Sequence, residues 1–112
     1  MKKEVIRPWG KFNTYAFNEK CTVKIITVNK GEILSLQKHK HRSETWIAID
    51  SGLVAQVGNK KFKLKIGQRI NISKHTKHRI SSTKKARFLE VSFGKFDEND
   101  EIRLEDKYGR VK

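Results

Sequence analysis

Short apolar runs recur along the chain, and clusters of polar residues separate them. Each run has the length of a strand and is rich in β-branched and aromatic side chains. No segment keeps a 3.6-residue apolar period long enough to predict a helix with confidence. The predicted strands are residues 23–28, 33–36, 45–49, 53–57, 62–64, 69–72, 78–81 and 87–93. This pattern predicts an all-β barrel or sandwich.

The connections between these runs carry turn signals, such as Asn29-Lys30-Gly31 and Asp50-Ser51-Gly52. A length of 112 residues fits one domain with one core. Within residues 1–112 we expect an N-terminal arm over 1–20, a barrel over 21–94 and an acidic tail over 95–112. The arm contains Arg-Pro-Trp-Gly, in which the proline fixes an irregular backbone.

The chain is strongly basic, with 26 Lys and Arg against 12 Asp and Glu and a net charge of +14. Such a field attracts nucleic acid, anionic membrane or a phosphorylated metabolite. The lysines are spread over many segments without interleaved aromatic residues, so nucleic acid is not the expected partner. No run approaches the length of a membrane span, and the N-terminus lacks an apolar signal core, so we expect a cytoplasmic protein.

A cluster of candidate metal ligands starts at Gln37. In an extended strand Gln37, His39 and His41 share one face, because side chains alternate with period two. Glu44 precedes the next apolar run, and His78 precedes a later one. A closed barrel would bring Gln37, His39, Glu44 and His78 together as oxygen and nitrogen ligands of a divalent metal.

The order and spacing of these residues resemble the cupin family. Gly31, five residues, Gln37, Lys38, His39, four residues and Glu44 fit its first motif, with Gln in place of the first His. Gly67, five residues, Ser73, Lys74, His75, two residues and His78 fit the second, with Ser73 and His75 in place of Pro and Gly. The resemblance implies a single-domain double-stranded β-helix, or jelly-roll barrel.

Three separated motifs narrow the resemblance to the type II mannose-6-phosphate isomerase domain, the C-terminal type of bifunctional enzymes with mannose-1-phosphate guanylyltransferase. They are Arg7-Pro8-Trp9-Gly10, residues 34–46 and residues 102–110. The resemblance implies metal-dependent interconversion of mannose 6-phosphate and fructose 6-phosphate, with Gln37, His39, Glu44 and His78 as the metal set. Zinc is the expected ion, and cobalt, manganese or nickel are alternatives. No Gly-rich nucleotide-binding segment is present, so guanylyl transfer is not expected.

An aldose-ketose isomerase needs a base and an anchor for phosphate. A register that pairs His39 with His41 fits the motif less well, which leaves His41 as the candidate base or as a solvated side chain. Arg7, Arg42 and Arg103 are candidate phosphate contacts, Arg7 also with a catalytic role, or they form surface ion pairs. Trp9 is a candidate wall of the sugar site.

Two other functions compete with the isomerase. One is a non-catalytic metal-binding or sugar-binding cupin, and the other is a basic barrel that binds nucleic acid. The expected partners are a small sugar phosphate and a second copy of the chain, since small cupins pair as dimers and a short barrel has a sheet edge to cover. The acidic tail either folds back over the barrel mouth or pairs with the basic body. No membrane partner is expected.

Overall fold

The structure is a computed structural model that describes residues 4–94 and 100–107. All strands lie in three antiparallel sheets, and no described residue belongs to an α-helix. The strands are β1 (Glu4–Arg7), β2 (Gly10–Asn13), β3 (Cys21–Val28), β4 (Leu36–His39), β5 (Arg42–Ala48), β6 (Leu53–Val57), β7 (Lys60–Lys63), β8 (Arg69–Ile72), β9 (His78–Ser82), β10 (Ala86–Gly94) and β11 (Glu101–Glu105). The predicted all-β barrel is confirmed. The described residues contain no helix long and apolar enough to cross a membrane.

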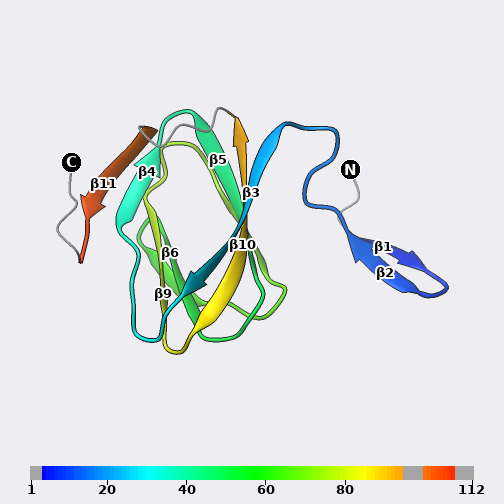
Figure 1. Cartoon of the computed structure of the whole chain (residues 1–112). Helices are drawn as coiled ribbons and strands as arrows, with labels where there is room; N and C mark the ends of the chain where they lie inside the picture. The colour runs from blue at the N-terminus through cyan, green and yellow to red at the C-terminus, as the bar shows by residue number, and fades with distance from the viewer. Residues whose placement is uncertain (1–3, 95–99, 108–112) are drawn as a thin grey trace.

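Two sheets form the barrel, and their inner faces enclose the core (Figure 1). One has the order β3-β10-β5-β8, and the other has the order β11-β4-β9-β6-β7. Apolar side chains at alternate positions point between the sheets, as period two requires. Phe88 and Ile80 are fully buried there. The ring of Trp46 packs edge-on against the ring of Phe88, with 5.5 Å between the ring centroids.

The N-terminal arm is more regular than the sequence predicted. β1 and β2 form a hairpin, with Val5 opposite Phe12 and Arg7 opposite Gly10. It extends away from the barrel, on the side of β3 (Figure 1). The chain then crosses toward the barrel, where Arg69 donates to the carbonyl of Thr14 at 2.8 Å.

The predicted acidic tail, residues 95–112, lies partly outside the described residues. Its described part includes β11, which pairs with β4 and so becomes the edge of the five-stranded sheet. This part of the tail therefore belongs to the barrel wall next to β4.

Candidate functional site

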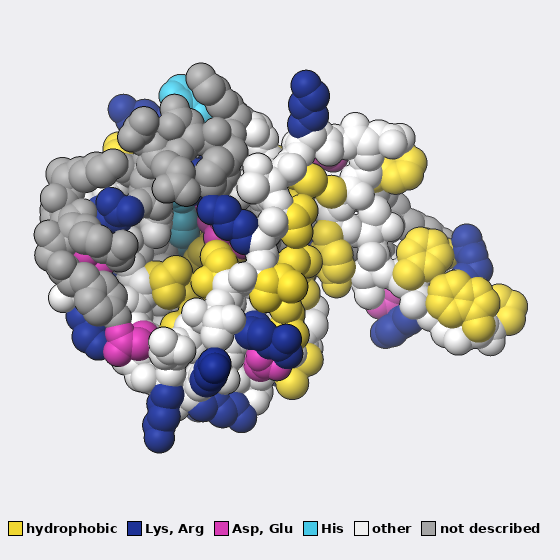
Figure 2. Space-filling view, viewed as in Figure 1, with side chains coloured by type: hydrophobic (Ala, Val, Ile, Leu, Met, Phe, Trp, Pro, Cys, Tyr) yellow, Lys and Arg dark blue, Asp and Glu magenta, His cyan; other side chains and the backbone are white. Residues whose placement is uncertain are grey.

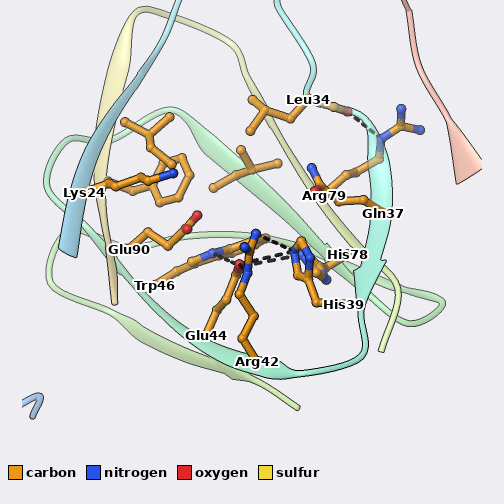
Figure 3. Close-up of a pocket in the computed structure, with 13 residues that line it drawn as sticks. Lys24, Leu34, Gln37, His39, Arg42, Glu44, Trp46, His78, Arg79 and Glu90 are labelled. Atoms are coloured by element: carbon orange, nitrogen blue, oxygen red, sulfur yellow. Dashed lines mark hydrogen bonds and ion pairs between the residues drawn. The ribbon is translucent and has the colours of Figure 1, made fainter. Parts of the chain in front are cut away.

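A cavity of about 160 Å³ lies between the two sheets. Trp46, Phe88 and other apolar side chains form part of its wall. Figure 3 shows the polar side chains converging from several strands. The polar and charged residues that line the cavity are Lys24, Gln37, His39, Arg42, Glu44, His78, Arg79 and Glu90.

His39, Glu44 and His78 form a buried group that we call the triad. His39 ends β4 and His78 begins β9, so both belong to the five-stranded sheet, whereas Glu44 comes from β5 of the opposite sheet. Each is at most 3% exposed, and one ligand atom from each lies within 4.8 Å of the other two. The triad therefore joins the two sheets across the cavity.

The separations within the triad suit a metal ion. Glu44 Oε2 is 3.3 Å from His39 Nε2, and Glu44 Oε1 is 3.5 Å from His78 Nε2. Two ligands of a tetrahedral zinc, each about 2.0–2.1 Å from the ion, lie roughly 3.4 Å apart. The donor set and its spacing thus fit a divalent metal.

The outer nitrogen of each imidazole contacts a backbone carbonyl. His39 Nδ1 lies 3.2 Å from the oxygen of Asp100, and His78 Nδ1 lies 2.8 Å from the oxygen of Thr76. A carbonyl only accepts, so each Nδ1 carries the proton and each Nε2 directs its lone pair at the triad. This is the arrangement that neighbouring groups impose on histidine ligands of metals.

Arg42 contacts two members of the triad. It is buried, its Nε donates to Glu44 Oε2 at 3.3 Å, and its terminal nitrogen lies 3.2 Å from His39 Nε2. Arg42 begins β5 opposite Gly94 of β10. A side chain at Gly94 would meet the carbonyl of His41 at 2.5 Å, so glycine allows the close approach of backbone beside Arg42.

The electrostatics of the triad favour a carboxylate and neutral imidazole. Burial alone would raise the pKa of Glu44, but its interactions with His39, His78 and the guanidinium of Arg42 outweigh burial and lower that pKa. Burial lowers the pKa of His78, and the charge of Glu44 opposes this only in part. Both residues are thus in their metal-binding protonation states at neutral pH.

Of the other predicted inward residues, Gln37 lies on the cavity wall and His41 does not. Gln37 is half-buried, pairs with His78 in the ladder and donates to Ser35 Oγ at 3.1 Å. His41 is exposed in the turn after β4, because the strand ends at His39. The expectation that His41 shares the inward face is not met.

The remaining predicted substrate residues lie away from the cavity wall, apart from Arg42. Arg7 and Trp9 belong to the hairpin, where Arg7 lies over the ring of Phe12 and Trp9 is 73% exposed. Arg103 is half-buried on β11, opposite Gln37 in the ladder. The structure therefore brings together Gln37, His39, Arg42, Glu44 and His78 from the predicted set.

Sequence reasoning missed three charged residues of the cavity, Lys24, Arg79 and Glu90. Lys24 and Glu90 are opposite each other in the ladder of β3 and β10. A usable signal was present, because period two places Glu90 on the same face as Phe88, which is fully buried. Burial raises the pKa of Glu90, and the nearby charge of Glu44 raises it further.

Most of the chain matches one family model. The family is described as "Mannose-6-phosphate isomerase C-terminal", and the match covers residues 1–106.

Curated relatives match across nearly the entire chain. Mannose-1-phosphate guanylyltransferase ManC of Salmonella typhimurium is 36% identical over 99% of the chain, and the alignment covers 24% of that protein. The alginate biosynthesis protein AlgA of Pseudomonas aeruginosa is 38% identical over 96% of the chain and 23% of that protein. The xanthan biosynthesis protein XanB of Xanthomonas campestris is 35% identical over 97% of the chain and 24% of that protein. The chain thus spans about a quarter of the length of these relatives.

Solved structures share the fold at low sequence identity. The nucleoside dehydratase Pac13 of Streptomyces has a TM-score of 0.69 and 14% identity, over 81% of this chain and 73% of that one. A predicted oxalate decarboxylase of Thermotoga maritima has a TM-score of 0.61 and 20% identity, over 65% of each chain. Such different named activities show that the shared barrel does not identify the chemistry.

The relatives correct the expectation of a mannose-6-phosphate isomerase without guanylyl transfer. Two of the three relatives are named for the synthesis of a polysaccharide, the third is named a guanylyltransferase, and none of these three names is that of an isomerase. The sequence-based assignment took the activity from the family resemblance. A resemblance over one domain locates a pocket but does not identify the reaction.

Proposed function

Because the chain belongs to the family of mannose-6-phosphate isomerase C-terminal domains, we propose that it is a metal-binding domain whose cavity takes a phosphorylated mannose. The ion is held by His39, Glu44 and His78. Gln37, on the wall beside His78, supplies a further oxygen. The sugar phosphate is the ligand class suggested by the relative named mannose-1-phosphate guanylyltransferase.

The main support for this proposal is the close approach of the ligand atoms of the three triad residues. Three buried ligand atoms within 4.8 Å, contributed by two sheets, give two imidazole nitrogens and a carboxylate oxygen, a donor set that suits a divalent cation. Zinc suits two imidazoles, a carboxylate and an open position for a ligand, and cobalt, manganese or nickel can take the same donors. When bound, the ion supplies a Lewis acid that orients oxygen atoms of a ligand.

Three cationic side chains in the cavity wall support a phosphorylated ligand. Lys24 projects from the four-stranded sheet and Arg79 from the five-stranded sheet, on opposite sides of the cavity (Figure 3), and Arg42 lies at the triad. A guanidinium makes paired hydrogen bonds to phosphate oxygens, and an ammonium adds charge. Glu90 supplies a group for the sugar hydroxyls. Roles for Arg7, His41, Arg103 and Trp9 stay predictions from sequence.

Metal binding is tested with the purified chain, by elemental analysis and by calorimetric titration with Zn²⁺ and Co²⁺. We expect one ion per chain, with binding weakened about 100-fold or more in Glu44→Gln and His78→Ala. His41→Ala removes an exposed histidine and serves as the matched control that binds as wild type. Equal binding in all four proteins would refute the site.

Ligand binding is tested on the metal-loaded chain by titration with mannose 1-phosphate, mannose 6-phosphate, mannose and inorganic phosphate. The proposal expects the two sugar phosphates to bind more tightly than mannose or phosphate, and Lys24→Met to weaken both. Metal binding without any preference for a sugar phosphate would leave the metal site standing and reject the ligand.

A further inference from the structure

The turn between β4 and β5 separates two ligands of the triad. His39 ends β4 and Glu44 lies in β5, so the backbone between them sets how these two side chains face each other. Lys40 and His41 in the turn are exposed, although both ligands are buried. Figure 2 shows a histidine and Lys or Arg side chains on the surface at this end of the barrel, at the top of the view. An exposed turn keeps a single shape only where other segments hold its backbone.

Asp100 holds this turn with both oxygens of its carboxylate. Oδ1 accepts the backbone N–H of Lys40 at 3.0 Å, and Oδ2 accepts the backbone N–H of His41 at 2.8 Å. Hydrogen bonds from N–H groups to an ionised carboxylate are stronger than those between neutral groups. Asp100 is only 9% exposed, so water competes weakly for them. The carboxylate therefore fixes two consecutive peptide groups of the turn.

The backbone of Asp100 contacts the ligand itself. Its carbonyl oxygen lies 3.2 Å from His39 Nδ1, and the next residue, Glu101, lies opposite His39 in the ladder of β11 and β4. The ladder thus fixes the place of this carbonyl. A hydrogen bond from Nδ1 leaves Nε2 without a proton, facing Glu44 Oε2 at 3.3 Å. Asp100 therefore influences both the tautomer and the direction of the ring.

Gly94 of β10 limits the turn from another direction. A side chain at Gly94 would meet the carbonyl oxygen of His41 at 2.5 Å, so the backbones of β10 and the turn lie in close contact. The N–H groups of the turn are bound by Asp100, and the carbonyl of His41 is packed against Gly94. Support of one short turn from two segments is what a precisely held binding site requires.

We propose that Asp100 is a positioning residue of the metal centre. Its carboxylate fixes the turn that spaces His39 and Glu44, and its carbonyl oxygen orients the His39 ring toward the ion. The inference rests on the metal site proposed above. It extends that site to the start of the C-terminal strand β11, although the proposed ligands all lie between residues 37 and 78.

Asp50 provides a matched comparison for a purely structural role. Its carboxylate also accepts a backbone N–H, from Arg87 at 3.0 Å, and so ties the loop after β5 to β10. Asp50 follows the end of β5, whereas Glu44 lies near its beginning. Loss of either carboxylate should lower the stability of the fold. Only the loss of Asp100 should also lower metal affinity.

The test is calorimetric titration of the full chain with Zn²⁺ and Co²⁺, with urea denaturation as the measure of stability. Asp100→Ala should bind about tenfold or more weakly than wild type, and Asp50→Ala should bind as wild type. Asp100→Asn keeps one of the two acceptor oxygens and should lie between Asp100→Ala and wild type. The visible spectrum of bound Co²⁺ should change in both Asp100 variants and stay the same in Asp50→Ala. Wild-type metal affinity in both Asp100 variants, or an equal loss in Asp50→Ala, overturns the proposal.

Nitrogen NMR of the imidazole rings gives a readout that needs no metal. At a pH where His39 is neutral, the metal-free wild type should carry the proton on Nδ1, and the Asp100 variants should populate the form protonated on Nε2. A wild type that binds no metal would reject the proposed function, and the His39 tautomer would then test Asp100 on its own. A tautomer that is the same in wild type and in both Asp100 variants overturns the part of Asp100 in orienting His39.

Discussion

The guanidinium of Arg42 binds the same carboxylate oxygen of Glu44 that faces His39. Arg42 Nε and His39 Nε2 both lie 3.3 Å from Glu44 Oε2, so the arginine occupies the position of a cation within the triad. A divalent ion at these atoms would repel the guanidinium, and Arg42 would have to turn aside. Arg42 thus opposes metal binding and, once displaced, is placed to meet an anionic ligand.

We expect Arg42→Leu to bind Zn²⁺ and Co²⁺ at least about tenfold more tightly than wild type, because the competing charge is removed. Arg79→Leu is the matched control. Arg79 lines the same cavity, but its Nε donates to the carbonyl of Leu34, away from the triad. Titration calorimetry measures both. Equal or weaker metal binding in Arg42→Leu than in Arg79→Leu would contradict competition by Arg42.

Metal should stabilise the fold through the triad, since it binds the native chain and joins the two sheets. A free metal concentration of about 100 times the dissociation constant adds about 2.7 kcal/mol. For a domain of this size that corresponds to a rise in melting temperature of roughly 10 °C. Differential scanning calorimetry with and without Zn²⁺ measures the shift. The rise should vanish in Glu44→Gln, and an undiminished rise there would place the stabilising ion elsewhere.

The local alternation of apolar and polar residues was enough to predict several strands of the barrel around the triad. Residues 53–57 and 69–72 were predicted as strands and form β6 and β8 with these bounds. Period two also indicates that Gln37 and His39 share a face, and both line the cavity. Such features depend on neighbours within one strand, which a sequence displays directly.

Features that depend on contacts between distant segments of the chain could not be predicted from the sequence. Extended geometry was expected to reach His41, but β4 ends at His39. The carboxylate of Asp100 accepts the backbone N–H groups of Lys40 at 3.0 Å and His41 at 2.8 Å, and so holds the turn. This contact spans about sixty residues of sequence. The pairing of β11 with β4 likewise depends on a partner that no local pattern reveals.

Trp46 links the core to the triad. Its Nε1 donates to Glu44 Oε1 at 3.2 Å, and its ring packs edge-on against His78 and Phe88. Trp46→Phe leaves the carboxylate without this donor, so we expect about 1–3 kcal/mol less stability and about tenfold weaker metal binding.

Phe88→Leu distinguishes the effect of the ring packing of Trp46 from the effect of its hydrogen bond to Glu44. It disturbs the same aromatic cluster and should cost about 1 kcal/mol, yet it touches no oxygen of Glu44. Urea denaturation measures the stability of both variants, and metal titration measures their metal affinity. If Phe88→Leu lowers metal affinity as much as Trp46→Phe, general packing and not the indole donor positions Glu44.

Glu90 should make stability fall as pH rises above the ordinary range of a carboxyl group. Burial, together with the charge of Glu44, raises the pKa of Glu90 in the folded chain, so the folded state holds a proton that the unfolded state has already released. The contribution of Glu90 to stability is therefore fully present below its unfolded pKa and is lost as pH rises through the folded pKa.

Glu90→Gln removes this loss of stability at higher pH. Its stability relative to wild type should increase from pH 4 to pH 7 by on the order of 1 kcal/mol, as measured by urea denaturation. Glu105→Gln, at a carboxylate that is 66% exposed, controls for the loss of one negative charge. A relative stability of Glu90→Gln that is the same at both pH values, or that follows the Glu105→Gln control, would contradict the raised pKa.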